Sequence, residues 1–431
     1  MNKRAFLIGA GGAGMSAIAK YLHAEGYTVL GSDSTHSPVI KDLEENYGFI
    51  YTGDHDASNI RIDIGLVVYT PAVGPGNVEY DKAVLLGIDM FSYPEYLGVI
   101  SKNKKTIAIA GTNGKTTTTT MTGEVLVHAG LDPTIIVGGV MTAFNTNYKR
   151  GESDLFVVEA CEYKDSFHSL YPTIAVITNL TPDHLDYFGT YENYKNTFMT
   201  FVENIVEEGT LICNTQDENL SEIIELARNR NLQIVDYTQE VITELSIPGK
   251  HNIQNAQAAS SVARVLSNES DTSKEYLASS FKGSKRRFQF LGTSPRGYEV
   301  YDDYAHNPEG LHVLIEGVRD RYPEKHIALF FQPHEYPRTK DFFAEFVTEL
   351  SLVDTLFLLP IYKARKPVDP SVSSVLLSEA IKWEKEDLNV ELPENFDEAV
   401  NLFDEKKLPE DTIVLVVGAG DIHKVGPMLV Q

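Results

Sequence analysis

Residues 107–120 read IAIAGTNGKTTTTT. An apolar run ends in a turn with two glycines, and a lysine and a row of threonines follow at once. The common phosphate-binding loop has four residues between its two glycines, whereas Gly111 and Gly114 enclose only Thr112 and Asn113. The spacing is unusual, but the order of apolar run, glycine turn and polar segment is typical of a strand that leads into a helix. The stretch therefore predicts a strand, a nucleotide-binding turn and a helix in an α/β domain.

The same turn carries the groups that a triphosphate requires. Backbone N–H groups of residues 111–115 can surround a phosphate, Lys115 can reach the β and γ oxygens, and the Thr116 hydroxyl can bind Mg²⁺. An NAD-dependent dehydrogenase has no need of such a loop. The turn therefore favours an enzyme that uses ATP.

Strand-like and helix-like segments alternate on both sides of this turn. Three such runs follow one another, and a basic segment, FKGSKRRFQF, separates the second run from the third. Alternation of this kind is the pattern of parallel sheets flanked by helices. We expect three consecutive α/β domains: a Rossmann-like domain over residues 1–100, a central P-loop domain over 101–284 and a C-terminal Rossmann-like domain over 285–431.

A second glycine-rich turn opens the chain. Gly9, Gly11 and Gly14 form G-x-G-x-x-G directly after a strand-like run, and Asp33 follows at the end of the next run. This is the context of a dinucleotide site, in which a helix N-terminus holds the pyrophosphate and an acid holds the ribose. A UDP-sugar presents the same groups as NAD, so the motif alone leaves both ligands open.

The composition limits the partners. The chain has 61 acidic and 37 basic residues and a formal charge of −24. A surface this acidic repels phosphate backbones and anionic lipid, so we expect neither a nucleic-acid nor a membrane partner. The two cysteines cannot form a disulfide framework, and no run approaches the roughly 18 apolar residues of a membrane span. We expect a cytoplasmic protein.

Two side chains that can bind a metal ion follow neighbouring strand-like runs. Glu159 ends DLFVVEA, and His184 lies in LTPDHLDYFG, after the next run, IAVITN. Each has an ordinary explanation as a solvated surface group. Because parallel strands deliver their carboxyl ends to one crevice, the two residues and Thr116 together predict a metal site beside the phosphate loop.

Taken in order, these motifs resemble those of the ATP-dependent Mur ligases of cell-wall peptide synthesis, and the resemblance covers nearly the whole chain. The family's GT-x-GKTTT, strand-end Glu and D-H-x-D are similar to residues 111–118, Glu159 and residues 183–186. Three further family elements resemble GKHNIQNAQAA at 249–259, KRRF at 285–288 and DDYAHNP at 302–308.

The resemblance implies that the protein binds ATP and Mg²⁺. The residues it assigns to ATP are Gly111, Thr112, Asn113, Gly114, Lys115, Thr116, Thr117, His251, Asn252, Asn255, Arg287 and Asp303. Those it assigns to the metal are Thr116, Glu159 and His184. The catalytic residues it implies are Lys115, Arg287, His306 and His184, with Arg287 reaching the γ-phosphate.

Within the family, the first domain is similar to the branch that joins L-alanine to UDP-N-acetylmuramate, and so is FFQPHEYPRT at 330–339. That likeness implies a set of substrate-binding residues: Gly11, Gly12, Ala13, Gly14, Met15, Ser16, Asp33, His55, His334 and Arg338. Glu335 departs from the arginine common in the branch, which leaves the amino-acid specificity open. EACEYKDSF departs from the common EADESD, and its Glu-Tyr is similar to a related ligase that attaches a recycled tripeptide.

The expected function is therefore an ATP-dependent ligase that forms an amide between an amino acid, first L-alanine, and the carboxylate of UDP-N-acetylmuramate through an acyl phosphate. The tripeptide ligase of wall recycling and a related wall-precursor ligase are the alternatives within the family. An NAD-dependent oxidoreductase with an added nucleotide module and a catalytically silent nucleotide-binding protein are the alternatives outside it. We expect a monomer or weak dimer.

Overall fold

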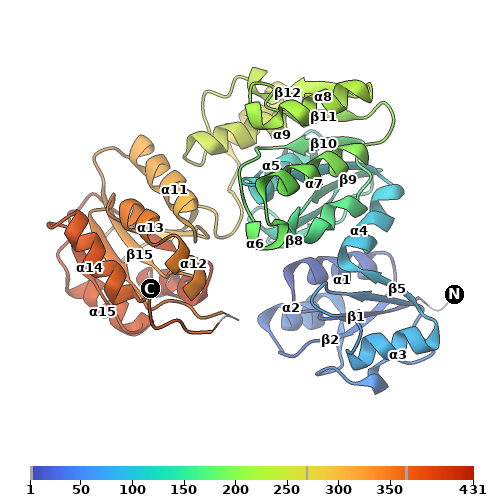
Figure 1. The fold of residues 1–431 in the computed structure, drawn as a ribbon, viewed down its shortest axis with the longest axis horizontal. Helices are drawn as coiled ribbons and strands as arrows, with labels where there is room; N and C mark the ends of the chain where they lie inside the picture. Colours follow the sequence, from blue (N-terminus) through green and yellow to red (C-terminus); the bar gives the residue numbers. More distant parts are fainter. Residues whose placement is uncertain (1–2, 268–269, 365–366) are drawn as a thin grey trace. The chain divides into compact units, whose positions relative to one another are not determined.

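The protein is described by a computed structural model that covers residues 3–267, 270–364 and 367–431. It contains three sheets that follow one another along the chain, each covered by helices, so the predicted α/β fold class is confirmed (Figure 1). The chain divides into two compact units. The first comprises Met1–Glu244 and Gln254–Phe281, and the second comprises Leu245–Ile253 and Lys282–Gln431.

The first sheet has five parallel strands in the order β3-β2-β1-β4-β5. Alternate residues of β1 face opposite sides: Ala5 and Leu7 pack in the core that α1 and α2 join, and Phe6 and Ile8 pack in the core that α3 joins. The strands are β1 Arg4–Ile8, β2 Thr28–Ser32, β3 Ile50–Tyr51, β4 Leu66–Tyr69 and β5 Asp89–Ser92. The helices are α1 Ala13–Ala24, α2 Pro38–Tyr47, α3 Val78–Leu86 and α4 Tyr93–Lys102.

The second sheet has seven strands in the order β12-β11-β10-β6-β9-β7-β8, with only β8 antiparallel to its neighbour. The central strand β6 is buried on both faces and delivers its carboxyl end to the glycine turn. The strands are β6 Lys105–Ala110, β7 Thr134–Met141, β8 Thr146–Lys149, β9 Leu155–Glu159, β10 Ile174–Ile177, β11 Thr210–Cys213 and β12 Gln233–Asp236. The helices are α5 Lys115–His128, α6 Leu185–Phe188, α7 Tyr191–Glu203, α8 Ser221–Asn229, α9 Lys250–Ser267 and α10 Ser270–Ser279.

The third sheet has six strands in the order β13-β14-β18-β15-β16-β17, with β13 antiparallel to β14. One face packs on α11, α13 and α14 and the other on α15 and α16. The strands are β13 Gln289–Thr293, β14 Glu299–Asp303, β15 His326–Phe331, β16 Thr355–Leu358, β17 Asn389–Glu391 and β18 Thr412–Val417. The helices are α11 Pro308–Arg321, α12 Tyr336–Asp341, α13 Phe343–Leu350, α14 Ser374–Glu384, α15 Phe396–Glu405 and α16 Val425–Leu429.

The first two sheets share one hydrophobic core, which is why they form a single compact unit. Polar bonds reinforce this junction. Buried Asn147, on β8, donates from Nδ2 to the Ala13 carbonyl at 2.6 Å and to Ser16 Oγ at 3.0 Å. Lys20, on α1, donates in turn to the side chains of Thr146 and Asn147. The start of α1, which follows the first glycine turn, is therefore fixed to the second sheet.

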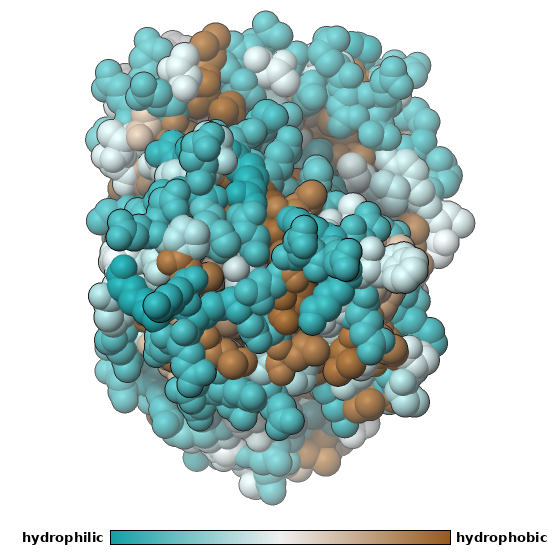
Figure 2. All heavy atoms as spheres, turned by 90° about the vertical axis from the view of Figure 1, so that its left-hand side faces the viewer, coloured by the Kyte–Doolittle hydropathy of each residue, from teal (hydrophilic) through white to brown (hydrophobic). Residues whose placement is uncertain are grey.

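Figure 2 shows the hydropathy of one face of the molecule. The face drawn in Figure 2 is largely hydrophilic, and hydrophilic side chains separate its apolar groups. None of the helices in residues 3–267, 270–364 and 367–431 has both the length and the apolar character needed to cross a membrane.

Helix α5 contains a buried acid that contacts α10. The Glu124 side chain is 1% exposed, and its Oε2 accepts a 2.8 Å hydrogen bond from the Tyr276 hydroxyl. Burial penalises the charged carboxylate and raises the pKa of Glu124 from 4.5 to about 7, and the bond from Tyr276 offsets this only in part. The folded protein therefore holds this proton across a pH range in which the unfolded chain releases it.

We expect Glu124→Gln to remove a pH dependence of stability. A folded-state pKa raised above the unfolded value adds stability at low pH, and that stability is lost as the pH rises toward 7. Between pH 5.5 and 8 the wild type should lose about 2 kcal/mol relative to the variant, by the linkage between pKa and folding. Urea unfolding at both pH values measures the difference. A stability difference that is equal at pH 5.5 and 8 would contradict an elevated pKa at Glu124.

Candidate active site

The glycine turn after β6 requires its two glycines for steric reasons. Gly111 has φ 136° and Gly114 has φ 83°, both in the region that side chains disfavour. A Cβ at Gly111 would lie 2.0 Å from Thr178 Oγ1, and one at Gly114 would lie 2.4 Å from Asn255 Oδ1. Gly114 is also the N-cap of α5, so the turn aims a helix N-terminus at the carboxyl edge of the sheet.

The residues after β10 form one wall of this turn. The backbone N–H of Thr112 donates to the Asn179 carbonyl at 3.1 Å, and the N–H of Asn113 donates to Asn179 Oδ1 at 2.9 Å. Asn179 Nδ2 and Thr178 Oγ1 donate back to the Asn113 carbonyl. Two of the five N–H groups that the sequence predicted for phosphate therefore hold the turn in shape instead. The remaining N–H groups at the start of α5 are the better candidates for a phosphate.

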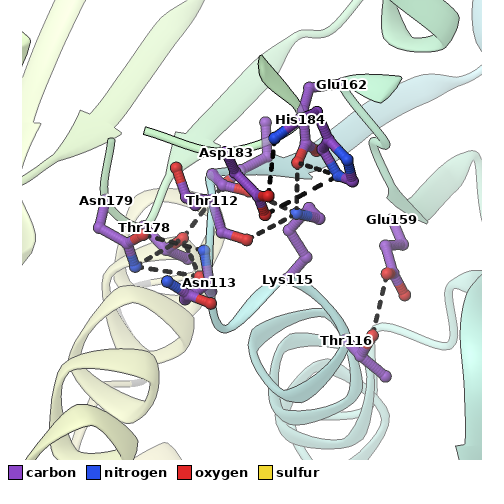
Figure 3. A network of polar contacts seen from close by, with 12 residues as sticks. Thr112, Asn113, Lys115, Thr116, Glu159, Glu162, Thr178, Asn179, Asp183 and His184 are labelled. Carbon is purple, nitrogen blue, oxygen red and sulfur yellow. Dashed lines mark hydrogen bonds and ion pairs between the residues drawn. The ribbon is translucent and has the colours of Figure 1, made fainter. Parts of the chain in front are cut away.

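Lys115, the first residue of α5, is held by three acceptors (Figure 3). Its Nζ donates to the carbonyl of Gly111 at 2.6 Å, to the carbonyl of Thr112 at 2.8 Å and to Glu162 Oε1 at 2.9 Å. Glu162 lies in the segment after β9, and its side chain is fully buried. Lys115 therefore lies at the mouth of the turn, next to a buried negative charge.

Thr116 and Glu159 form a separate pair beside Lys115 (Figure 3). Glu159 is the last residue of β9, which neighbours β6 in the sheet. Its Oε1 accepts from Thr116 Oγ1 at 2.9 Å, and its Oε2 accepts from the Gly138 N–H at 2.7 Å. A carboxylate and a hydroxyl at a strand end offer the oxygen ligands that Mg²⁺ prefers, and Mg²⁺ usually takes few of its ligands from protein. The pair fits the metal role predicted for it.

His184 contacts acids other than Glu159. It is the N-cap of the short helix α6, with φ 51°, and its Nε2 lies 3.8 Å from both Glu162 Oε1 and Asp183 Oδ2. Its ring packs against Tyr163. Within the described residues no group of three or more His, Cys, Asp or Glu side chains is close enough to hold a metal ion. The predicted metal set of Thr116, Glu159 and His184 stays a prediction.

The first glycine turn is braced by its predicted acid. The N–H of Gly11 donates to Asp33 Oδ2 at 2.9 Å, so this carboxylate contacts the turn directly. Gly12 is the N-cap of α1, which begins at Ala13. Met15 and Ser16 are each 3% exposed, so their side chains offer little surface to a ligand. Residues 11–16 can contact a ligand mainly through their backbone N–H groups.

His55 belongs to a hydrogen-bond network around Glu79, a buried residue of α3. Its Nδ1 lies 2.7 Å from Glu79 Oε2 and 3.0 Å from Ser32 Oγ, and Ser32 also donates to the same Glu79 oxygen. Asn59 Nδ2 donates to the other Glu79 oxygen at 2.7 Å. Because Glu79 can only accept as a carboxylate, the imidazole presents a protonated Nδ1 to it. The contacts of Nδ1 with Glu79 and Ser32 fix the orientation of the His55 ring, and Nε2 points away from both residues.

Three of the residues predicted to bind ATP, His251, Asn252 and Asn255, fall on both sides of the division between the units. In the first unit, Asn255 Oδ1 accepts from Thr118 Oγ1 at 3.0 Å and lies against Gly114, so it touches the phosphate turn. In the second unit, Asn252 is buried and donates to the Pro248 carbonyl at 2.6 Å. Burial, and next the charge of Arg287, lower the pKa of His251 from 6.5 to about 4, so this ring is neutral at pH 7.

Arg287 and Asp303 lie at the start of the third sheet. The guanidinium of Arg287 stacks over the Tyr304 ring, with 5.3 Å from Cζ to the ring centroid, and Arg286 covers the same ring at 4.9 Å. Asp303 ends β14 and accepts from the N–H groups of Phe288 and Ala305. Burial raises the pKa of Asp303, and Arg287 opposes that effect. Asp303 thus fixes the backbone next to Arg287.

His306, His334 and Arg338 come together in the second unit. The rings of His306 and His334 have centroids 6.0 Å apart. Arg338 Nη1 donates to His334 Nδ1 at 3.1 Å and to the His334 carbonyl at 3.2 Å. His306 Nδ1 donates to the Tyr304 carbonyl at 3.0 Å, which leaves Nε2 as an acceptor.

Burial, assisted by the charge of Arg338, keeps both of these rings neutral. Burial lowers the pKa of His306 to about 4, with the charge of Arg338 as the next cause. Burial and Arg338 also lower the pKa of His334. Neutral His306 is a weak base at neutral pH, but its Nε2 can accept a hydrogen bond, and Arg338 remains a cation beside it. Such a group can hold a carboxylate and orient an amine.

Three residues of this site were missed by the sequence analysis: Glu162, Asn179 and Tyr194. Asn179 is the last residue of the predicted strand-like run IAVITN, so its place at the carboxyl edge could have been inferred. Glu162 lies beyond the end of β9 in a turn where Lys164 and Asp165 both have positive φ, and no regular period reveals where its side chain points. Buried Tyr194 lies on α7, and its hydroxyl is 3.0 Å from Thr112 Oγ1.

Comparison with known proteins agrees with this arrangement over the whole chain. Three family models match in order: "Mur ligase family, catalytic domain" over residues 6–105, "Mur ligase middle domain" over 109–241 and "Mur ligase, glutamate ligase domain" over 286–420.

Full-length relatives extend the match. A UDP-N-acetylmuramate--L-alanine ligase of Clostridium acetobutylicum is 39% identical, over all of this chain and 98% of the relative. The crystal structure of UDP-N-acetylmuramate-alanine ligase from Thermotoga maritima is 26% identical, with a TM-score of 0.79 over 99% of this chain and 98% of that one. A murein peptide ligase from Psychrobacter arcticus shares the fold at 22% identity and a TM-score of 0.67, over 99% of this chain and 98% of that one. The chain belongs to the Mur ligase family.

Proposed function

We propose that this protein is an ATP-dependent ligase that joins L-alanine to the carboxylate of UDP-N-acetylmuramate in the synthesis of peptidoglycan precursors. The observation that carries the proposal is the phosphate turn, with Lys115 and the Thr116–Glu159 pair at one sheet edge, in a chain similar over its full length to UDP-N-acetylmuramate--L-alanine ligases. The first glycine turn, braced by Asp33, supports binding of the UDP part.

The reaction requires activation of a carboxylate, which is a poor acyl donor. The sugar's carboxylate oxygen attacks the γ-phosphorus of ATP, the bond to the β-phosphate oxygen breaks, and an acyl phosphate and ADP form. The amine of the amino acid then attacks the acyl carbon, and phosphate leaves as the amide forms. The protein contributes chiefly by positioning these groups and by neutralising charge.

Lys115, Arg287 and the start of α5 are the groups proposed to bind the transferring phosphoryl group. A Mg²⁺ ion, held by Thr116 and Glu159, would supply charge neutralisation on the phosphate oxygens. The Gly138 N–H, which donates to Glu159 Oε2, orients this carboxylate. His184 is assigned to the same site by resemblance to the family, and its contacts with Glu162 and Asp183 support a position beside Lys115.

His334 and Arg338 are proposed to bind the amino acid. Both hydrogen bonds from Arg338 to His334 use Nη1, and among the described residues Nη2 and Nε have no other partner, so they can pair with a carboxylate in bidentate fashion. His306 is proposed to assist the amine, because its neutral ring offers Nε2 as a hydrogen-bond acceptor that can orient the attacking nitrogen. Glu335 has φ 68° and opens α12, so the residue that departs from the branch pattern lies beside this group.

The other readings are less well supported. The phosphate turn argues against the oxidoreductase, and the retained Lys115, Glu159, His184 and Arg287 argue against a silent nucleotide-binding protein. Similarity supports the L-alanine ligase, since the full-length relatives carry that name and the solved alanine ligase has a higher TM-score, 0.79, than the murein peptide ligase, 0.67. The expected cytoplasmic location, the absence of nucleic-acid and membrane partners and the monomer or weak dimer stay predictions.

Phosphate release tests the function. With ATP and Mg²⁺ present, phosphate should appear only when both UDP-N-acetylmuramate and an amino acid are added, and L-alanine should be the best of a panel that includes glycine and L-serine. Lys115→Ala should reduce this turnover on the order of 10³-fold, as loss of a phosphoryl-transfer cation does elsewhere. Calorimetry should still detect the UDP-sugar on the variant. A rate of ATP hydrolysis that is the same with and without the two substrates would exclude the proposed ligase function.

Arg338→Lys should raise the KM for the amino acid at least tenfold and leave the KM for ATP unchanged. Lysine keeps the charge but loses the planar pair of donors that a carboxylate accepts. Initial rates of phosphate release at varied L-alanine and varied ATP separate the two constants. Arg321→Lys, an exposed change at the end of α11, is the matched control. An unchanged KM for L-alanine would mean that Arg338 does not bind the amino acid.

A further inference from the structure

Every donor of the Lys115 ammonium is in use. An ammonium has three N–H groups, and Nζ of Lys115 donates to the Gly111 carbonyl, the Thr112 carbonyl and Glu162 Oε1, all between 2.6 and 2.9 Å. Lys115 can donate to a phosphate oxygen only if it gives up one of these three bonds. Two of the acceptors are neutral carbonyls and the third is a carboxylate. Losing the bond to Glu162 would therefore separate an ion pair, whereas losing a bond to a carbonyl would not.

Glu162 depends on Lys115 for its charge balance. Its side chain is fully buried, and among the described residues its Oε2 has no hydrogen-bond partner. Besides Lys115, Oε1 has the Tyr194 hydroxyl at 3.5 Å and His184 Nε2 at 3.8 Å. Burial and the charge of Glu162 raise the pKa of Tyr194, so this phenol is a neutral donor. Lys115 is therefore the one cation within hydrogen-bond distance of Glu162 in the described structure.

A move of Lys115 toward a phosphate would leave a buried carboxylate uncompensated, which is strongly unfavourable. Glu162 would hold a divalent cation through the oxygen that Lys115 leaves, and the cation would supply the positive charge that compensates the buried carboxylate. Mg²⁺ usually binds one or two carboxylates together with water and phosphate. Among the described residues, Glu162 Oε2 has no hydrogen bond that a cation would break. Figure 3 shows that Asp183 and His184 lie on the same side of Lys115 as Glu162.

We propose that Lys115 and Glu162 form a charge-exchange pair: Lys115 turns to the triphosphate as a divalent cation replaces it at Glu162. The inference rests on the proposed function only in taking ATP as the ligand. It makes Glu162 a cation ligand in addition to the Thr116–Glu159 pair, and it makes nucleotide affinity depend on the cation through Glu162. Without the cation, the nucleotide must compete with Glu162 for the same ammonium.

Calorimetry with a non-hydrolysable ATP analogue tests the exchange. In the wild type, replacing Mg²⁺ by EDTA should weaken binding strongly. In Glu162→Gln this Mg²⁺ dependence should fall at least tenfold, because metal-free binding becomes tighter when the competing charge is gone. Glu124→Gln makes the same change at a buried site on the same helix as Lys115 and should keep the wild-type dependence. An unchanged dependence in Glu162→Gln, or weaker metal-free binding, would overturn the proposal.

A second measurement uses no nucleotide and does not require Glu162→Gln to fold. Electron paramagnetic resonance of Mn²⁺ should show at least tenfold tighter binding to Lys115→Gln than to the wild type, since the variant leaves Glu162 without its cation. Equal Mn²⁺ affinity in the two proteins would contradict the exchange. Neither readout involves the amino acid or the sugar. If no phosphate is released but the cation dependence is as expected, only the ligase function is wrong. If phosphate is released but the cation dependence is absent, only the exchange is wrong.

Discussion

The site is organised by one constraint: a negative charge, Glu162, lies in the interior beside the lysine of the phosphate turn. A buried carboxylate is tolerated only when a cation and hydrogen bonds compensate it. Lys115 supplies that charge here, and the carbonyls of Gly111 and Thr112 hold the ammonium in place. Thr178 and Asn179, which follow the neighbouring strand β10, hold the glycine turn by hydrogen bonds to Asn113. The position of the phosphate-binding groups therefore follows from charge balance as well as from the glycine geometry.

The sequence predicted those parts of the molecule that depend on local order along the chain. The alternation of segments predicted the α/β class, and the strand-end rule placed Gly111 and Glu159 at one edge of the second sheet, where Thr116 indeed bonds Glu159. It could not show that the N–H groups of Thr112 and Asn113 donate to Asn179, because these residues are distant in sequence: Asn113 and Asn179 are 66 positions apart. Nor could it show Glu162, whose direction is set by an irregular turn.

The division of the molecule is also a tertiary property. Three sheets are visible in the pattern, but the first two share a core, and Asn147 bonds the carbonyl at the start of α1. Residues 245–253, which the sequence analysis assigned to the central domain, cluster with the C-terminal residues, where Lys250 pairs with Glu316 and Asp320. Such contacts arise between segments distant in sequence, so composition and periodicity give no sign of them.

The separate core of the third sheet has a consequence for how new ligases arise. Since the proposed amino-acid group of His306, His334 and Arg338 lies in a unit with its own two hydrophobic layers, substitutions that alter side-chain selectivity need not disturb the packing of the other sheets. Substitutions in that group can therefore accumulate, or be exchanged by recombination, without repacking the first two sheets, which share one core and have to change together.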